Sequence, residues 1–168
     1  IVQVAMTEPA DRPASLTSVV LAWGVHLFTA SGAVVGALAL LSIWAGEFGN
    51  AALLMLCALF IDAVDGSLAR AVGVSKVLPN VDGRRLDDMV DYLNFVVVPL
   101  VFMTAAGNLP GWAWVAPPIL ASAYGFSQAS AKTKDDFFLG WPSYWNVVAL
   151  YCWLLNLSTT LGAFWVLV

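Results

Sequence analysis

Charge is scarce in this sequence: 11% of its 168 residues are charged, whereas 61% are hydrophobic. A soluble globular domain carries about a quarter of its residues as charges. So little charge cannot cover a surface that faces water, which excludes a soluble enzyme and a disordered tail. The net charge of −4 also argues against nucleic-acid binding, because phosphate backbones require a basic surface.

Cysteine and histidine are almost absent. Cys57 and Cys152 stand alone in apolar runs, which excludes a disulfide scaffold and indicates small core side chains. The one histidine, His26, lies in an apolar segment near Thr29 and has no histidine partner with which to bind a metal. Two interpretations of His26 remain open: a buried hydrogen-bonding residue, or, together with Thr29, a contact to a nucleotide or phosphate.

Long apolar runs are abundant, and a bilayer-spanning helix needs about 20 such residues. The runs predict an all-α integral membrane protein with a single domain over 1–168. We expect a bundle of about five transmembrane helices, at 18–44, 51–70, 86–106, 112–130 and 142–168. The basic residues fall before the first span, between the second and third, and after the fourth: Arg12, Arg70, Lys76, Arg84, Arg85, Lys132 and Lys134. The positive-inside rule then places this side, and the N-terminus, in the cytoplasm.

Four aspartates interrupt the apolar runs beside one cytoplasmic loop. Asp62 and Asp65 are three residues apart and Asp87 and Asp91 four apart, so each pair shares one helix face. A carboxylate at membrane depth costs roughly 2.5–3.5 kcal/mol, and clustered carboxylates repel one another. Mg²⁺ and Mn²⁺ prefer such hard oxygen ligands. The acids therefore predict a divalent-metal site, with snorkelling of acids to the interface as the alternative.

Small residues and an arginine complete this pattern, which reads Asp62-x-x-Asp65-Gly66-x-x-Ala69-Arg70 and then Gly83-x-x-x-Asp87-x-x-x-Asp91. The pattern resembles the signature of the CDP-alcohol phosphotransferase family, and every specified position matches. The 12-residue spacer from Ala71 to Asp82 is longer than is common in the family. This spacer, with blocks at 22–30, 90–93 and 137–148, is similar to the bacterial phosphatidylcholine synthase branch.

The resemblance implies a membrane transferase that moves the phosphatidyl group from CDP-diacylglycerol to choline and releases CMP, assisted by two Mn²⁺ or Mg²⁺ ions. It implies a bacterial inner-membrane location, an active site that faces the cytoplasm, and a homodimer as a candidate assembly. The family core usually has six helices, so C-terminal helices would be missing from this chain. By match to the signature, Asp91 would act as general base. The metal ligands would be Asp62, Asp65, Asp87 and Asp91, and the CDP-binding residues Asp62, Gly66, Ala69, Arg70 and Gly83.

Choline is a permanent cation, and proteins commonly bind such a ligand against the faces of aromatic side chains. Near the predicted cytoplasmic side lie Trp23, Tyr92, Phe95, Tyr144 and Trp145, with Asn146 as a hydrogen-bonding neighbour. The same aromatic residues also fit an interfacial belt. Two other functions remain open, namely transfer to serine or inositol and a divalent-cation carrier, although acids gathered on one side argue against a carrier.

Overall fold

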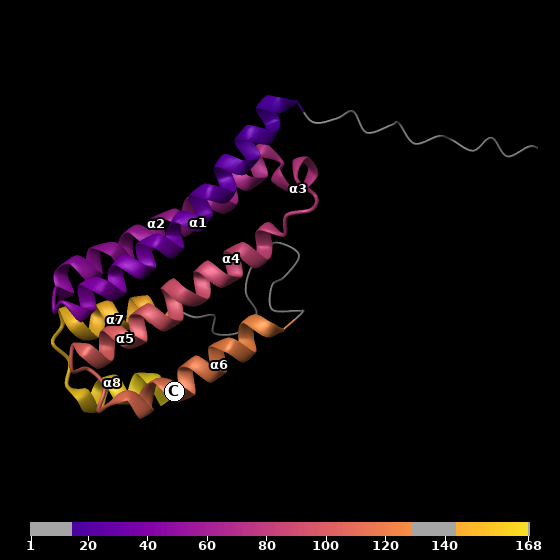
Figure 1. Ribbon diagram of the computed structural model, residues 1–168. Coiled ribbons are helices and arrows are strands. Elements are labelled where there is room, and N and C mark those ends of the chain that lie inside the picture. The colour runs from indigo at the N-terminus through magenta and orange to yellow at the C-terminus, as the bar shows by residue number, and fades with distance from the viewer. Residues whose placement is uncertain (1–14, 129–143, 168) are drawn as a thin grey trace, which may run out of the picture.

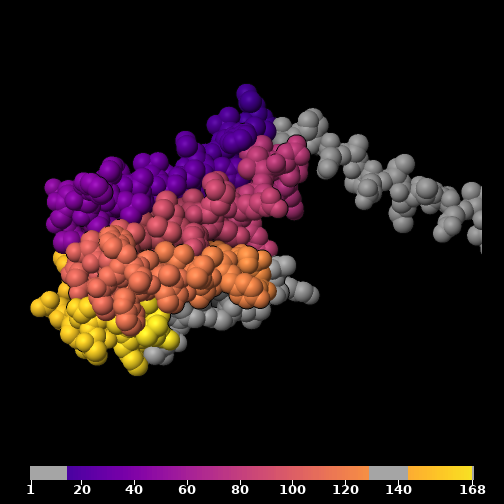
Figure 2. All heavy atoms as spheres, turned by 60° about the horizontal axis from the view of Figure 1, so that its bottom comes forward, coloured from indigo at the N-terminus to yellow at the C-terminus, as the bar shows by residue number. Residues whose placement is uncertain are grey.

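The computed structural model describes residues 15–128 and 144–167, and within these ranges the backbone forms helices and no strand. The helices lie in layers, with α1 and α2 on one side, α4 and α5 in the middle, and α6 with α8 on the other side (Figures 1 and 2). This confirms the all-helical class. Arg12, Lys132, Lys134 and the sequence block 137–143 lie outside the described residues.

Two long helices form an antiparallel hairpin, α1 (Leu16–Trp44) and α2 (Phe48–Val72). The side chain of Ser15 caps α1 by accepting a hydrogen bond from the Ser18 N–H at 3.1 Å. Gly73, with φ of 68°, ends α2 in the left-handed conformation that glycine adopts without strain. These ends match the expected spans 18–44 and 51–70 to within three residues.

The third crossing contains a π-helical turn. After the short α3 (Val74–Val77), the chain runs through α4 (Gly83–Tyr92), the π-helical turn η1 (Leu93–Val97) and α5 (Val98–Ala105). Pro99 has no N–H and its ring would clash with the carbonyl group four residues earlier in a regular α-helix. The wider turn, in which the Val98 N–H donates to the Leu93 carbonyl, accommodates Pro99 at the start of α5.

Two glycines on α1 let this crossing approach closely. A Cβ atom at Gly32 would lie 2.7 Å from Cγ1 of Val90, and one at Gly36 would lie 2.5 Å from Oδ1 of Asn94. Small residues spaced four apart are typical of close helix contacts in membranes. This role of the Gly32/Gly36 pair was not predicted from the sequence.

The expected fourth span begins as a 3₁₀ turn, η2 (Trp112–Val115), and becomes α-helical only in α6 (Ala116–Ser127). Pro117 and Pro118 explain this start, because proline is tolerated in the first turn of a helix but not in its interior. The remainder of that span, 129–130, is outside the described residues.

The expectation of one helix over 142–168 is wrong. The described part of this segment contains two helices, α7 (Trp145–Leu154) and α8 (Thr159–Leu167). Asn156 breaks the helix with φ of +50°, and the Leu157 N–H donates to the Cys152 carbonyl at 2.9 Å. Figure 1 shows that α8 turns back beside η2 and α6 instead of extending α7.

Within residues 15–128 and 144–167, three helical stretches are long and apolar enough to cross a membrane: Leu16–Trp44, Phe48–Val72 and Gly83–Ala105. Their outer faces expose large apolar side chains such as Leu27 and Phe60, as expected where lipid is the solvent. The η1 turn and α5 supply most of the largest fully buried side chains, among them Val96, Val98, Leu100, Phe102 and Met103. The middle layer is therefore the core of the bundle.

Candidate active site

The aspartates of α2 and α4 meet at one end of the bundle, as predicted. Carboxylate oxygens of Asp62, Asp87 and Asp91 all lie within 4.8 Å of one another. Asp65, which is buried, lines the same cavity, as does Thr29 on α1. Residues from two separate crossings thus form one acidic cluster, defined here as Asp62, Asp65, Asp87 and Asp91.

Such a cluster fits a divalent cation. Mg²⁺ and Mn²⁺ bind carboxylate oxygens and keep open coordination positions for water or a phosphate. The three adjacent carboxylates can supply ligands from both helices, and the cavity beside them leaves room for a second group. Without a cation, the mutual repulsion of these carboxylates would oppose helix packing.

A cavity of about 1020 Å³ opens beside the cluster. Its other walls combine small residues, basic residues, and polar and aromatic side chains. The small ones are Ala63, Gly66, Ala69, Gly73 and Gly83, and the basic ones are Arg70, Lys76 and Arg84. A cavity lined by both acids and basic residues can hold a metal-bridged diphosphate, because the acids bind the metal and the basic side chains bind the phosphates.

Arg70 bends back along α2 toward the cluster. Its Nη2 atom donates to the Ser67 hydroxyl at 3.3 Å, and a Cβ atom at Gly66 would lie 3.4 Å from its Nη1 atom. The missing side chain of Gly66 therefore leaves the guanidinium group accessible beside the acids. This position favours the phosphate-binding interpretation of Arg70 over snorkelling to lipid headgroups.

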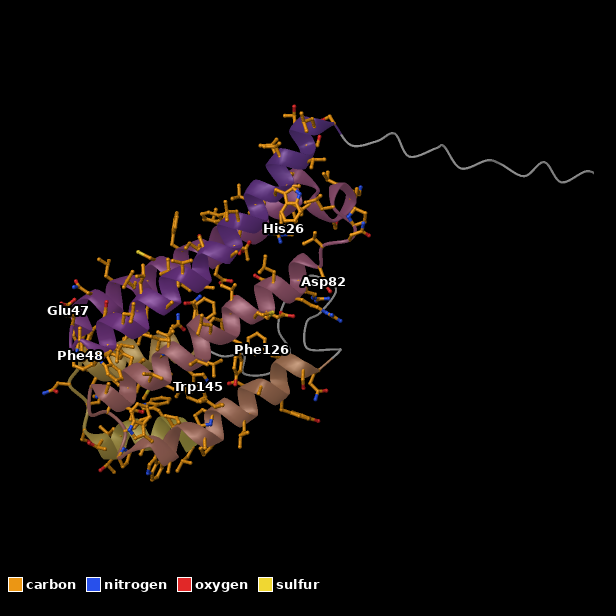
Figure 3. All side chains as sticks on the ribbon, in the orientation of Figure 1. His26, Glu47, Phe48, Asp82, Phe126 and Trp145 are labelled. Atoms are coloured by element: carbon orange, nitrogen blue, oxygen red, sulfur yellow. The ribbon has the colours of Figure 1, made fainter. Side chains whose placement is uncertain are left out.

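Gly83 begins α4 directly against His26 of α1. Asp82 caps this helix start by accepting from the Arg85 N–H at 3.1 Å. A Cβ atom at Gly83 would lie 2.9 Å from Cε1 of His26, so the glycine makes room for the imidazole. His26 is buried, lines the cavity, and its Nε2 atom has no hydrogen-bond partner among the described residues. Figure 3 shows His26 and Asp82 at one end of the bundle, with Glu47 and Phe48 at the opposite end.

The structure separates the aromatic candidates into two groups. Phe95 and Tyr144 line the cavity together with Asp91, whereas the described lining residues do not include Trp23, Tyr92, Trp145 or Asn146. Their contacts lie elsewhere: the Trp145 indole donates to the Ser122 hydroxyl at 3.0 Å, and the Tyr92 hydroxyl donates to the Ile119 carbonyl at 3.1 Å. These two bonds fasten α7 and α4 to α6.

The ring of Trp23 is half-exposed and lies edge-on to the imidazole of His26, with ring centroids 6.1 Å apart. Asn146 is almost fully buried, with 1% of its surface exposed. Neither residue reaches the cavity wall.

Phe126 also lines the cavity, and the sequence did not lead us to expect it there. Its ring stands edge-on to that of Tyr92, with centroids 5.7 Å apart, and it points from α6 toward α4 (Figure 3). The one signal in the sequence was its place near the end of an apolar run, just before the charged loop at 132–136. Three aromatic residues, Phe95, Phe126 and Tyr144, thus line the same cavity as Asp91.

Comparison with known proteins points to one family. Over 154 residues the chain is 44% identical to a phosphatidylcholine synthase of Legionella pneumophila, covering 89% of this chain and 60% of that protein. It is 43% identical over 135 residues to one of Legionella bozemanae, covering 78% of this chain and 62% of that protein. Over 136 residues it is 39% identical to one of Borreliella burgdorferi, covering 79% of this chain and 58% of that protein.

The chain therefore spans 58–62% of the length of these three relatives. No solved structure matches it. The sequence profile of CDP-alcohol phosphatidyltransferases matches residues 20–168, a range that includes the acidic cluster and the helices that carry it. The chain belongs to the CDP-alcohol phosphatidyltransferase family.

Proposed function

We propose that this protein synthesises phosphatidylcholine by transferring the phosphatidyl group of CDP-diacylglycerol to choline, with release of CMP. The observation that carries the proposal is the acidic cluster beside a cavity with basic and aromatic walls. The names of the relatives, which are phosphatidylcholine synthases, support the same activity.

The acidic cluster would hold two divalent ions, Mn²⁺ or Mg²⁺. Bound there, the ions would neutralise the diphosphate and stabilise the charge on the leaving phosphate oxygen. Arg70 binds the diphosphate from beside the cluster, while Gly66, Ala69 and Gly83 leave space for the cytidine diphosphate. His26 offers its buried ring nitrogen to the same nucleotide part.

Asp91 is the general base in this proposal. It accepts the hydroxyl proton of choline as the choline oxygen attacks the phosphorus that carries the diacylglycerol group. The new O–P bond forms while the bond from phosphorus to the CMP oxygen breaks. A base within hydrogen-bond reach of the attacking hydroxyl typically contributes a factor of about 10²–10⁴ to the rate.

Phe95, Phe126 and Tyr144 form the acceptor wall. A trimethylammonium group has no N–H to donate, so aromatic faces and a nearby carboxylate recognise it better than hydrogen-bond acceptors do. Serine and inositol lack such a group. This wall favours choline over those alternative acceptors.

In this proposal the protein lies in the bacterial inner membrane, with the cavity facing the cytoplasm. The basic side chains Arg70, Lys76 and Arg84 border the cavity, and the positive-inside rule assigns such a loop to the cytoplasmic side. That orientation lets CDP-diacylglycerol keep its acyl chains in the bilayer while its nucleotide enters the cavity. Cytosolic choline reaches the site directly.

The test is incorporation of radiolabelled choline into lipid by membranes that contain the protein. We expect incorporation to require added CDP-diacylglycerol, to stop on chelation of divalent ions, and to return with Mn²⁺ or Mg²⁺. Incorporation of labelled serine or inositol instead would replace choline as the acceptor. Choline incorporation without the nucleotide lipid would contradict the transferase reaction.

A further inference from the structure

Helix α1 carries no acidic residue, yet it packs against both acid-bearing helices. Thr29 on α1 and Asp65 on α2 are both buried and line the same cavity. One turn further along α1, the Gly32 carbonyl accepts a hydrogen bond from Nδ2 of Asn94 at 3.0 Å. Residues three apart share a helix face, so one short face of α1 lies beside both acid-bearing helices.

Asn94 is the buried side chain that makes the second of these contacts. It lies in the η1 turn, three residues after Asp91, with 3% of its surface exposed. Its Nδ2 atom donates to the Gly32 carbonyl and also to the Val90 carbonyl, at 3.1 Å. Val90 directly precedes Asp91, so one amide group joins α1 to the backbone turn that carries Asp91.

Gly32 and Gly36 of α1 leave the space that this amide occupies. A Cβ atom at Gly36 would lie 2.5 Å from Oδ1 of Asn94, and one at Gly32 would lie 3.6 Å from Nδ2 of Asn94. Apolar side chains alone would let two membrane helices slide or rotate past each other at little cost. A directional hydrogen bond in a glycine-lined contact fixes both the depth and the rotation of α4 on α1.

We propose that Asn94 is the positioning residue of the acidic cluster: it sets the register of α4 on α1 so that Asp87 and Asp91 meet Asp62. The inference rests on the proposed function in one respect, namely that the cluster binds a divalent cation. Such ions tolerate little deviation from their coordination geometry. A displacement of about 1 Å is enough to impair a reacting site. Loss of the Asn94 contacts should therefore weaken cation binding, whereas loss of a similar buried amide far from the cluster should lower only the folding stability.

The experiment measures binding of Mn²⁺ alone to the purified chain in detergent, from the loss of the free Mn²⁺ signal in electron paramagnetic resonance. The variants are Asn94→Leu, which has a similar volume but no donor, and Gly36→Ala, which disturbs the same contact from α1. The matched control is Asn108→Leu. Asn108 is also buried and also donates from Nδ2 to two backbone carbonyls, those of Cys152 and Leu157, but at the opposite end of the bundle.

We expect Asn94→Leu and Gly36→Ala to weaken Mn²⁺ binding at least about tenfold. Asn108→Leu should lower the Tm to a similar degree but leave Mn²⁺ affinity within about twofold of the wild type. The proposal is overturned if Asn94→Leu binds Mn²⁺ as the wild type does, or if Asn108→Leu loses as much affinity as Asn94→Leu. Should Asn94→Leu not fold, Gly36→Ala decides by the same criteria. A wild-type chain that binds no Mn²⁺ would contradict the metal role in the proposed function itself, which is a distinguishable result.

Discussion

At the end of the bundle that holds the acidic cluster, polar side chains border a cavity, whereas at the opposite end they are bonded to backbone carbonyls. Asn108 donates to the carbonyls of Cys152 and Leu157, and the Thr159 hydroxyl donates to that of Gly107. Gly162 packs so closely on the Asn108 backbone that a side chain there would collide with it. Asn108 therefore serves packing at the opposite end, whereas at the cavity end the buried side chains of His26, Asp65 and Asp91 line the cavity.

The largest effect should come from Asp91→Asn at the cavity end. The amide cannot accept the choline proton, so turnover should fall by about 10²–10⁴-fold while much of the CDP-diacylglycerol binding remains. Choline incorporation and equilibrium binding of labelled CDP-diacylglycerol measure the two quantities. Asp88→Asn is the matched control and should keep most of the activity, because Asp88 is not among the described residues that line the cavity. Substantial turnover by Asp91→Asn would refute the assignment of the base.

At the opposite end, Gly162→Ala should lower stability without touching the chemistry. The new Cβ atom would collide with the Asn108 carbonyl, and overpacking of this kind costs about 1–3 kcal/mol. We expect a lower Tm and an unchanged Mn²⁺ affinity. Gly49→Ala is the control, because a Cβ atom at Gly49 would meet no packing neighbour within 4 Å, and alanine favours a helix over glycine. A loss of Mn²⁺ affinity in Gly162→Ala would mean that the two ends are coupled.

Phe126→Leu should affect the acceptor alone. Loss of one cation–π contact costs about 0.5–2 kcal/mol, so the KM for choline should rise about two- to thirtyfold. The KM for CDP-diacylglycerol should stay the same. Phe60→Leu on the outer face of α2, where Phe60 is 67% exposed, is the control and should change neither constant. If the choline KM of Phe126→Leu equals that of the wild type, Phe126 does not belong to the acceptor wall.

The smallest effect is expected for Gly83→Ala. Its Cβ atom would lie 2.9 Å from the His26 ring and displace it, which should raise the KM for CDP-diacylglycerol about three- to tenfold, or about 0.7–1.4 kcal/mol. Because His26→Ala removes the clash, Gly83→Ala should cost less in that background. Equal cost in both backgrounds, measured by a double-mutant cycle, would show that the two residues act independently.

The acidic cluster could be predicted from the sequence because the residues that define it lie close together in the chain. The spacing of Asp62 and Asp65, and of Asp87 and Asp91, fixes a shared face on each helix, and the loop between them is short enough to bring the faces together. The long spans were predictable for the same reason, since an uninterrupted apolar run allows few other structures in a bilayer. The structure confirms that Asp62, Asp87 and Asp91 come together.

The remaining features depend on contacts between distant segments. Trp145 and Asn146 looked suitable for an acceptor site, but Trp145 bonds to Ser122, which lies in another helix. Asn108 stabilises the break at Asn156 by donating a hydrogen bond to the Leu157 carbonyl. Asn108 lies 48 residues before Asn156 in the sequence. No pattern within residues 142–168 reveals such a partner. Pro99 lies inside the expected span 86–106, and the sequence analysis did not predict the π-helical turn that accommodates it.

The π-helical turn at Leu93–Val97 divides the third crossing into two helical segments, α4 and α5, and sets the rotation of one relative to the other. In α4, Asp87 and Asp91 face the cavity, and in α5, Phe102 and Met103 are buried in the core. If all the same residues formed a regular α-helix instead, the segment after the turn would be rotated against the segment before it by about 100°, the angle of one residue. The aspartates would then leave the cavity, or the large apolar side chains would leave the core. Backbone regularity and the joint alignment of site and core are mutually exclusive in this helix.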